Sequence, residues 1–123
     1  FNDYPENKSL KEVLNGELEF DQIFSNKLYN ISHQLAKTSN IGSHKYQGEW
    51  GILDQFIISG NLLSIENKIY TQLTDVHIFN ADFLLEPDES YFGYMPFRTF
   101  NGYKYNAGFS DHLPTYLILR FRD

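Results

Sequence analysis

A carboxylate and an imidazole stand next to each other near the end of the chain, in Ser110-Asp111-His112. A histidine can hold or transfer a proton near neutral pH, and a carboxylate can bind a metal ion or orient water. Neighbouring side chains of an extended backbone point to opposite faces, so we expect Asp111 and His112 to have separate partners. A carboxylate from a remote segment would fix the tautomer of the histidine and support its protonated form.

Asp54 is the best candidate for that remote carboxylate. It is the lone charged residue of an apolar stretch over residues 53–59, which we expect to form a central strand. Its position alone fits two interpretations about equally well. Asp54 is either a water-exposed residue at the rim of the strand or a carboxylate directed at a histidine.

His44 is a candidate for lining a cleft. Residues 43–50 alternate in a way that predicts one strand, with His44, Tyr46 and Trp50 on one face. The opposite face then carries Lys45, Gln47 and Glu49. A structural role for His44 in packing against these aromatic neighbours is the simpler alternative.

Arg98 lies in an aromatic segment, residues 80–106, that leads the chain back toward Ser110. We expect this segment to be a long irregular connection, and such connections are usually functional or mobile. The guanidinium of Arg98 binds a substrate phosphate or stabilises its own loop. The second role is slightly favoured, with an acidic partner among Glu86, Asp88 and Glu89.

Three motifs in order resemble a known family. Leu53-Asp54-Gln55 precedes an apolar stretch that ends at Ser59, and Ser110-Asp111-His112-Leu113-Pro114 precedes a final apolar strand over residues 115–121. The opening Phe1-Asn2-Asp3-Tyr4-Pro5 is similar to the tail of a Gly-Asp-x-Asn-Asp-x-Pro motif. Together they resemble the C-terminal half of the endonuclease/exonuclease/phosphatase family, the deoxyribonuclease I-like metal-dependent phosphoesterases. The combination, which spans Asn2 to Phe121, is far more specific than any one motif.

The resemblance implies a role for each candidate residue. His112 would contact the scissile phosphate or act as general base, with Asp54 on its other ring nitrogen. Asn2 would donate its amide to the phosphate or to the attacking water, and Asp111 would be a ligand of Mg²⁺ or Mn²⁺. His44 and Arg98 are the further candidates for substrate binding.

The resemblance also implies a fold. We expect an α/β (α+β) chain, the C-terminal half of a deoxyribonuclease I-like four-layer sandwich, with one mostly antiparallel sheet and two helices on one face. Residues 1–123 would be a single partial domain whose N-terminal half is absent. Apolar periodicity predicts helices over residues 7–16 and 25–37 and strands over residues 43–50, 53–59, 74–79 and 115–121.

Composition narrows the classes of function. The formal net charge of −6 shows no basic footprint for duplex nucleic acid, and the absence of cysteine excludes disulfides and thiolate metal sites. No apolar run is long enough for a membrane span, and localisation stays open.

We therefore expect a fragment of a metal-dependent phosphoesterase, inactive alone. Its substrate would be a nucleic acid, a phospholipid head group or a small phosphoester. Its protein partner would be the missing N-terminal half or a second copy of the fragment. The alternative is a non-catalytic binding module that uses the aromatic segment 80–106.

Overall fold

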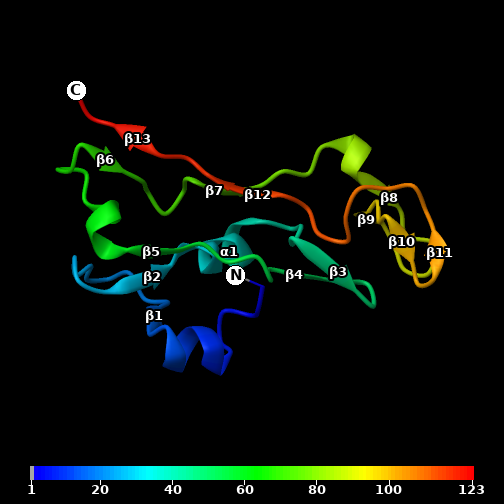
Figure 1. Ribbon diagram of the computed structural model, residues 1–123, viewed down its shortest axis with the longest axis horizontal. Helices are drawn as coiled ribbons and strands as arrows, with labels where there is room; N and C mark the ends of the chain where they lie inside the picture. The colour runs from blue at the N-terminus through cyan, green and yellow to red at the C-terminus, as the bar shows by residue number, and fades with distance from the viewer. Residues whose placement is uncertain (1) are drawn as a thin grey trace.

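The structure is a computed structural model that describes residues 2–123 (Figure 1). Phe1, the first residue of the N-terminal motif, lies outside the described residues. The chain consists of many short strands and a few helical turns, which confirms the mixed α+β class. No helix among residues 2–123 is both long enough and apolar enough to cross a membrane.

Both predicted helices are shorter than expected. The first is a single π-helical turn, η1 (Ser9–Val13). In the second segment, residues 28–30 form the strand β2 (Leu28–Asn30), followed by the 3-10 turn η2 (Ile31–Gln34) and the α-helix α1 (Leu35–Thr38).

Backbone pairing explains why the second helix does not begin earlier. β2 pairs in antiparallel fashion with β5 (Ile57–Ser59), with Tyr29 opposite Ile58, and it pairs in parallel with β1 (Gly16–Glu17). These ladder hydrogen bonds override the helical periodicity of the sequence. The order β1-β2-β5 also places β5 at an edge, so the prediction of a central strand over residues 53–59 was wrong.

The single strand predicted over residues 43–50 is a hairpin instead. β3 (His44–Tyr46) and β4 (Glu49–Gly51) pair in antiparallel fashion around Gln47 and Gly48, which have φ values of 49° and 87°. Two residues with positive φ form the turn that matches the twist of paired strands. The predicted grouping of faces was wrong for Trp50, which lies directly opposite Lys45 in the ladder and so shares its face. Lys45 is buried, whereas Tyr46 is 64% exposed.

The strand predicted over residues 74–79 is confirmed, and the one predicted over residues 115–121 is present as two shorter strands. β7 (Val76–Ile78) pairs with β12 (Thr115–Leu117), and β6 (Ile69–Tyr70) pairs with β13 (Arg120–Phe121). Both ladders are antiparallel and run along one long side of the molecule toward the C-terminus (Figure 1). The 3-10 turn η3 (Gly60–Leu63) connects β5 to this side.

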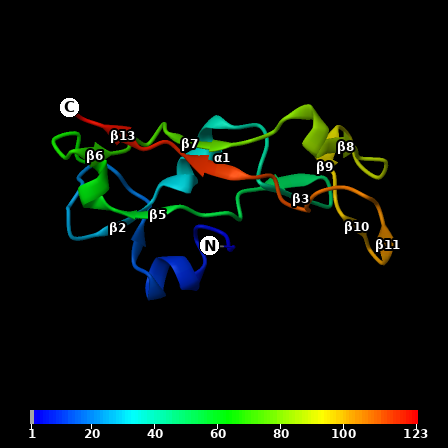
Figure 2. The same ribbon diagram turned by 45° about the horizontal axis from the view of Figure 1, so that its top comes forward.

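Residues 80–106 are not an irregular connection. They contain the 3-10 turn η4 (Asp82–Leu84) and two antiparallel pairs, β8 (Leu85–Pro87) with β9 (Tyr94–Pro96) and β10 (Phe100–Asn101) with β11 (Lys104–Tyr105). Both views place these pairs together at one end of the molecule, away from the C-terminus (Figures 1 and 2). Their turn-forming residues, such as Gly93 and Gly102 with positive φ, account for the composition that suggested a loop.

The strands of residues 2–123 form six separate small sheets, one of three strands and five of two, instead of the expected single sheet. The main core lies between the β2–β5 and β7–β12 ladders and α1. Its buried members are Tyr29, Ile31, Leu35, Ile52, Ile58 and Val76. Burial of these apolar side chains holds the short ladders in place, since a two-stranded pair alone is marginally stable in water.

Candidate functional site

The carboxylate of Asp54 lies 2.7 Å from the imidazole of His112, between Oδ2 and Nδ1. The two residues are 58 positions apart in the chain. Both side chains are partly exposed, 31% for Asp54 and 21% for His112. The Asp54 carboxylate is therefore directed at the histidine, and Nε2 of His112 is left as the ring nitrogen available for a ligand.

Ser43 positions Asp54 from below the surface. Its hydroxyl accepts hydrogen bonds from the backbone N–H groups of Leu53 (3.1 Å) and Asp54 (3.3 Å). Ser43 is completely buried, so these bonds do not compete with solvent. The short hydroxyl lets the backbone around Asp54 approach β3 without forming a regular strand.

The same serine also holds the segment that carries His112. The backbone N–H of Leu113 donates to the carbonyl of Ser43 at 2.7 Å, and His44 and His112 form an isolated antiparallel bridge. The hydroxyl of Ser110 accepts from the backbone N–H of His112 at 3.1 Å, a local turn that sets the direction of the histidine. Ser43 thus contacts both segments of the Asp54–His112 pair.

Gly108 is needed for close packing at the start of this turn. A Cβ atom at this position would lie 2.3 Å from the carbonyl oxygen of Phe97. The backbone N–H of Gly108 donates to the carbonyl of Arg98, and that of Phe109 to the carbonyl of Phe97. Two backbone hydrogen bonds consequently hold the turn before Ser110 against the segment between β9 and β10.

The N-terminal segment runs beside Asp54. Asn2 and Asp54 form an antiparallel bridge, and the backbone N–H of Asp3 donates to the carbonyl of Leu53 at 2.9 Å. The side-chain amide of Gln55 donates to the carbonyl of Asp3 at 3.0 Å. Asn2 is exposed, so its amide is accessible next to the carboxylate.

Asp3 stabilises the first helical turn rather than the site. Its carboxylate accepts hydrogen bonds from the side chains of Ser9 and Asn7 and from the backbone N–H of Tyr4. The hydrogen bonds from Ser9 and then Asn7 lower the pKa of Asp3. The second acidic position of the N-terminal motif therefore anchors η1.

His44 packs against His112, with ring centroids 4.8 Å apart. Burial of the imidazole lowers the pKa of His44, and the nearby His112 and Arg98 lower it further against the opposing effect of Asp111 and Asp54. His44 is therefore neutral near pH 7 and offers a lone pair or an N–H group instead of a positive charge.

Asp111 completes a cluster of possible metal ligands. One ligand atom each of His44, Asp111 and His112 lies within 4.8 Å of the other two. Asp111 is exposed, and its hard carboxylate oxygen suits Mg²⁺ or Mn²⁺ with water and substrate oxygens as further ligands. The residues present fit a divalent ion at Asp111, although it is the cluster's one carboxylate among the described residues.

Arg98 contacts the β3–β4 hairpin, which also carries His44. Its Nη2 donates to the carbonyl of Lys45 at 2.6 Å, and its buried Nε has no hydrogen-bond partner within residues 2–123. Two of the acidic partners expected for Arg98 are engaged elsewhere, because Glu86 accepts hydrogen bonds from Asn106 and Asp88 pairs with Lys45. Arg98 thus lies beside His44 without an ion pair to either acid.

Sequence reasoning missed Lys45 and Asp88. The ammonium of Lys45 lies 2.8 Å from the Asp88 carboxylate, and the two side chains are only 3% and 6% exposed. The same ammonium donates to the carbonyl of Phe92 at 2.9 Å. Asp88 was expected as a possible partner of Arg98, and nothing in the local sequence pattern pairs it with Lys45. Ser43 was also missed, because nothing in the local sequence pattern marks a buried serine that accepts backbone hydrogen bonds.

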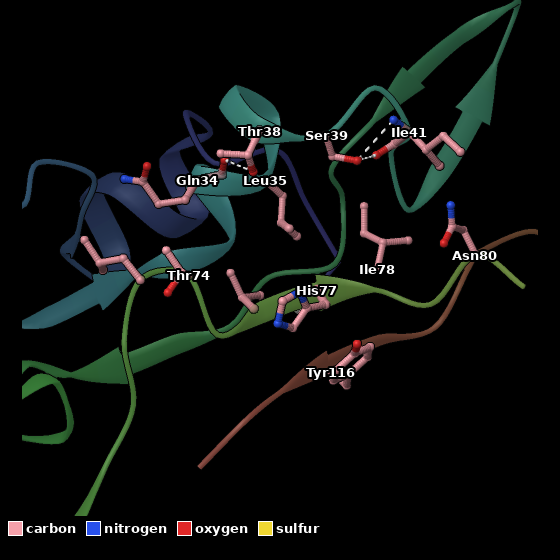
Figure 3. Close-up of a pocket in the computed structure, with 12 residues that line it drawn as sticks. Gln34, Leu35, Thr38, Ser39, Ile41, Thr74, His77, Ile78, Asn80 and Tyr116 are labelled. Carbon is pink, nitrogen blue, oxygen red and sulfur yellow. Dashed lines mark hydrogen bonds between the residues drawn. The ribbon is translucent and has the colours of Figure 1, made fainter. Parts of the chain in front are cut away.

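A cavity of about 390 Å³ lies elsewhere, between α1 and the β7–β12 ladder (Figure 3). His77 and Tyr116 stack on one side of it, with ring centroids 5.0 Å apart, and Ser39 donates to the carbonyl of Ile41 on the other. Among the residues that the structure describes, its lining contains no carboxylate and one imidazole, that of His77. This cavity therefore offers fewer groups for acid-base or metal chemistry than the surroundings of the Asp54–His112 pair.

Comparisons with known proteins give the family of the chain. No curated protein and no solved structure gives a significant match to the chain. A family model described as the endonuclease/exonuclease/phosphatase family matches residues 1–121. This family consists of phosphoesterase-type hydrolases, which generally use a divalent metal ion. The match includes all three segments of the site, and the chain belongs to the endonuclease/exonuclease/phosphatase family.

Proposed function

We propose that this site hydrolyses phosphodiester or phosphomonoester bonds with the help of a divalent metal ion. The observation that supports the proposal most is the 2.7 Å contact between Asp54 and His112, within a chain that belongs to a phosphoesterase family. Phosphoester hydrolysis needs an oriented water molecule, stabilised phosphoryl charge and a departing oxygen. The site offers groups for each requirement.

His112 is the central catalytic residue of the proposal. In the proposal Asp54 accepts a hydrogen bond from Nδ1–H, which fixes the ring and leaves Nε2 for substrate. A protonated ring donates a hydrogen bond to a phosphoryl oxygen, whereas a neutral ring accepts a proton from water. Both roles depend on the ring orientation that the hydrogen bond to Asp54 fixes.

Asp111 is the proposed metal ligand, for Mg²⁺ or Mn²⁺. A bound divalent ion would polarise the phosphoryl group and neutralise its charge. Mg²⁺ sites in proteins commonly have one or two carboxylates, with water and substrate oxygens completing the shell. Because Asp111 alone supplies the carboxylate of the cluster, we expect residues 1–123 by themselves to have little turnover. Further ligands would come from a partner segment such as the other half of the domain, or from a second copy.

Asn2, Arg98 and His44 are the proposed substrate contacts. The amide of Asn2 lies on the segment bridged to Asp54 and would donate to phosphate or to the attacking water. Arg98 would offer a guanidinium N–H to a substrate oxygen, and the neutral imidazole of His44 would donate one hydrogen bond beside His112. Phosphate in a nucleic acid, a phospholipid head group or a small phosphoester would satisfy the same contacts. The net charge of −6 favours substrates other than long duplex DNA.

The decisive experiment compares His112→Ala with the unchanged protein at its natural full length. We expect kcat/KM for a chromogenic phosphodiester, measured with Mg²⁺ or Mn²⁺, to fall by about 10²- to 10⁴-fold, the usual contribution of a positioned acid-base group. Chelation with EDTA should abolish turnover in the unchanged protein.

His77→Ala is the matched control for this experiment. His77 lies in β7 against Tyr116, away from the pair, and its loss should leave turnover within about twofold. Unchanged turnover in His112→Ala would overturn the proposed hydrolase. A panel of nucleotide, lipid and small phosphoester substrates then identifies the class that the site prefers.

A second candidate function is a binding module at the β8–β11 end. Phe92 and Tyr103 are fully exposed there, 102% and 107%, and exposed aromatic side chains often mark contact surfaces. The convergence of Asp54 and His112 favours the enzyme, because a binding module has no need of that pair. Retained turnover in a Phe92→Ser and Tyr103→Ser double variant would separate the two functions.

A further inference from the structure

The three residues His44, Asp111 and His112 combine two nitrogen ligands with one oxygen ligand. Mg²⁺ prefers oxygen, whereas Zn²⁺, Co²⁺ and related borderline ions prefer imidazole together with carboxylate. A set of two imidazoles and one carboxylate is a common protein ligand set for Zn²⁺ with an open fourth position. The donor chemistry therefore fits a second class of ion besides the one expected for hydrolysis.

Backbone structure brings these ligands together before any ion binds. His44 and His112 face each other across an antiparallel bridge, and Asp111 is the neighbour of His112 in the chain. The three ligand atoms lie within 4.8 Å of one another. Tetrahedral Zn²⁺ with bonds of about 2.0–2.1 Å needs ligand atoms roughly 3.4 Å apart. The widest separation between two ligand atoms must therefore shorten by roughly 1.4 Å when an ion binds. Rotation of the exposed Asp111 side chain can supply much of this movement.

The environment supports a metal-binding histidine at position 112. The Asp54 carboxylate holds Nδ1 at 2.7 Å, the arrangement that orients metal-binding histidines. The ring nitrogen left for an ion is therefore held in a fixed direction.

We propose that His44, Asp111 and His112 form a binding site for a borderline transition-metal ion such as Zn²⁺, and that this ion inhibits the enzyme. The inhibitory part rests on the proposed function, since the ion would occupy the same Nε2 of His112 that contacts phosphate. His44 is the residue that distinguishes this site from the oxygen-rich one expected for Mg²⁺. Zn²⁺ and substrate would then exclude each other.

Binding is tested first without substrate. Calorimetric titration of the protein at its natural full length with Zn²⁺ should show one site, and Co²⁺ should give the visible absorption of a low-symmetry complex that Zn²⁺ abolishes. His44→Ala and the exposed Asp111→Asn should each weaken Zn²⁺ binding at least tenfold, the usual minimum loss when a ligand or its support is removed. His77→Ala should bind as the unchanged protein does.

Two outcomes would overturn the site: no Zn²⁺ binding at this stoichiometry, or unchanged affinity in both His44→Ala and Asp111→Asn. Circular dichroism of the two variants distinguishes loss of a ligand from loss of the fold. Inhibition is then measured as the Zn²⁺ concentration that halves turnover, which should rise at least tenfold in His44→Ala. Zn²⁺ binding with turnover independent of His112 would reject the hydrolase and keep the metal site. Turnover that depends on His112 in a protein that does not bind Zn²⁺ would reject the metal site alone.

Discussion

At the scale of single residues, the two ring nitrogens of His112 have different environments. Nδ1 lies against the carboxylate of Asp54, and Nε2 is left for a ligand. A hydrogen bond at one nitrogen determines which chemistry the other can perform, because it fixes both the tautomer and the ring orientation. Asp54 is consequently a positioning residue in the proposed reaction, and its contribution can be separated from that of His112.

Asp54→Asn keeps the size of the side chain and removes its negative charge. We expect kcat/KM to fall by about 10- to 100-fold, the usual effect of losing a partner that orients an active-site histidine. The pH profile of kcat/KM should change as well, since the ring of His112 loses the carboxylate that holds its Nδ1. Asp82→Asn is the control, because Asp82 is exposed and lies in η4, outside the site. Equal pH profiles in both variants would mean that Asp54 has only a structural role.

The Asp54–His112 contact could be predicted from the sequence. The hydrogen bonds of Ser43 that hold the two segments of this contact could not. The Leu-Asp-Gln and Ser-Asp-His motifs combine residue types that chemistry requires, and their order in the chain is specific. Ser43 carries no such signal. Its importance comes from complete burial and from accepting two backbone hydrogen bonds, which depend on the packing of segments distant in sequence.

At the scale of elements, the β3–β4 hairpin joins the site to the β8–β11 end. Lys45 of β3 binds Asp88 and the carbonyl of Phe92, and Arg98 binds the carbonyl of Lys45. His44 precedes Lys45 directly, so a change in the position of β3 is transmitted to the His44–His112 contact. A buried ion pair of this kind is weak evidence for stability, but removal of one partner leaves an uncompensated charge.

Lys45→Met and Asp88→Asn should each lower the thermal midpoint of unfolding, because each leaves the other member buried without its partner. The double variant should lose less than the sum of the single losses, since the two residues are in direct contact. Differential scanning calorimetry measures all three midpoints. Lys104→Met, at an exposed position of β11, is the control for loss of a lysine. Strictly additive losses would show that the Lys45–Asp88 pair is not energetically coupled.

Element type was predictable where periodicity and pairing agree, as in residues 74–79 and 115–121. It was not predictable where they disagree. Residues 28–30 carry part of a helical stripe, yet their backbone pairs with both β1 and β5. In residues 80–106, strands of two or three residues are too short to show an alternation, so their turns dominate the pattern.

At the scale of the whole molecule, the last strand is attached through charge as well as by its ladder. Arg120 of β13 forms two hydrogen bonds to the carboxylate of Asp75, from Nε at 2.7 Å and Nη2 at 2.6 Å. The Asp75 side chain is 3% exposed, and its Oδ2 also accepts from the backbone N–H of Gln72. The carboxylate thus ties the C-terminal strand to the loop before β7.

This contact predicts how stability depends on pH. The Arg120 hydrogen bond is the main cause that lowers the pKa of Asp75 below its ordinary value of 3.8, against the opposing effect of burial. A carboxyl group whose pKa is lower in the folded state stabilises the fold fully above its ordinary pKa. That contribution is lost as the pH falls through the lower, folded-state value. Acid should therefore weaken attachment of β13 below about pH 4.

Urea unfolding at several pH values between about 6 and 2 tests this expectation, with Asp75→Asn as the variant. The amide cannot titrate, so the free energy of unfolding should fall less steeply in acid for Asp75→Asn than for the unchanged protein. At pH 6 the variant should be the less stable of the two, because Arg120 has lost its ionic partner. Asp21→Asn, at an exposed position, should follow the unchanged protein throughout. Parallel pH curves for Asp75→Asn and the unchanged protein would show that the acid sensitivity comes from other carboxylates, of which Asp3 and Asp88 also have lowered pKa values.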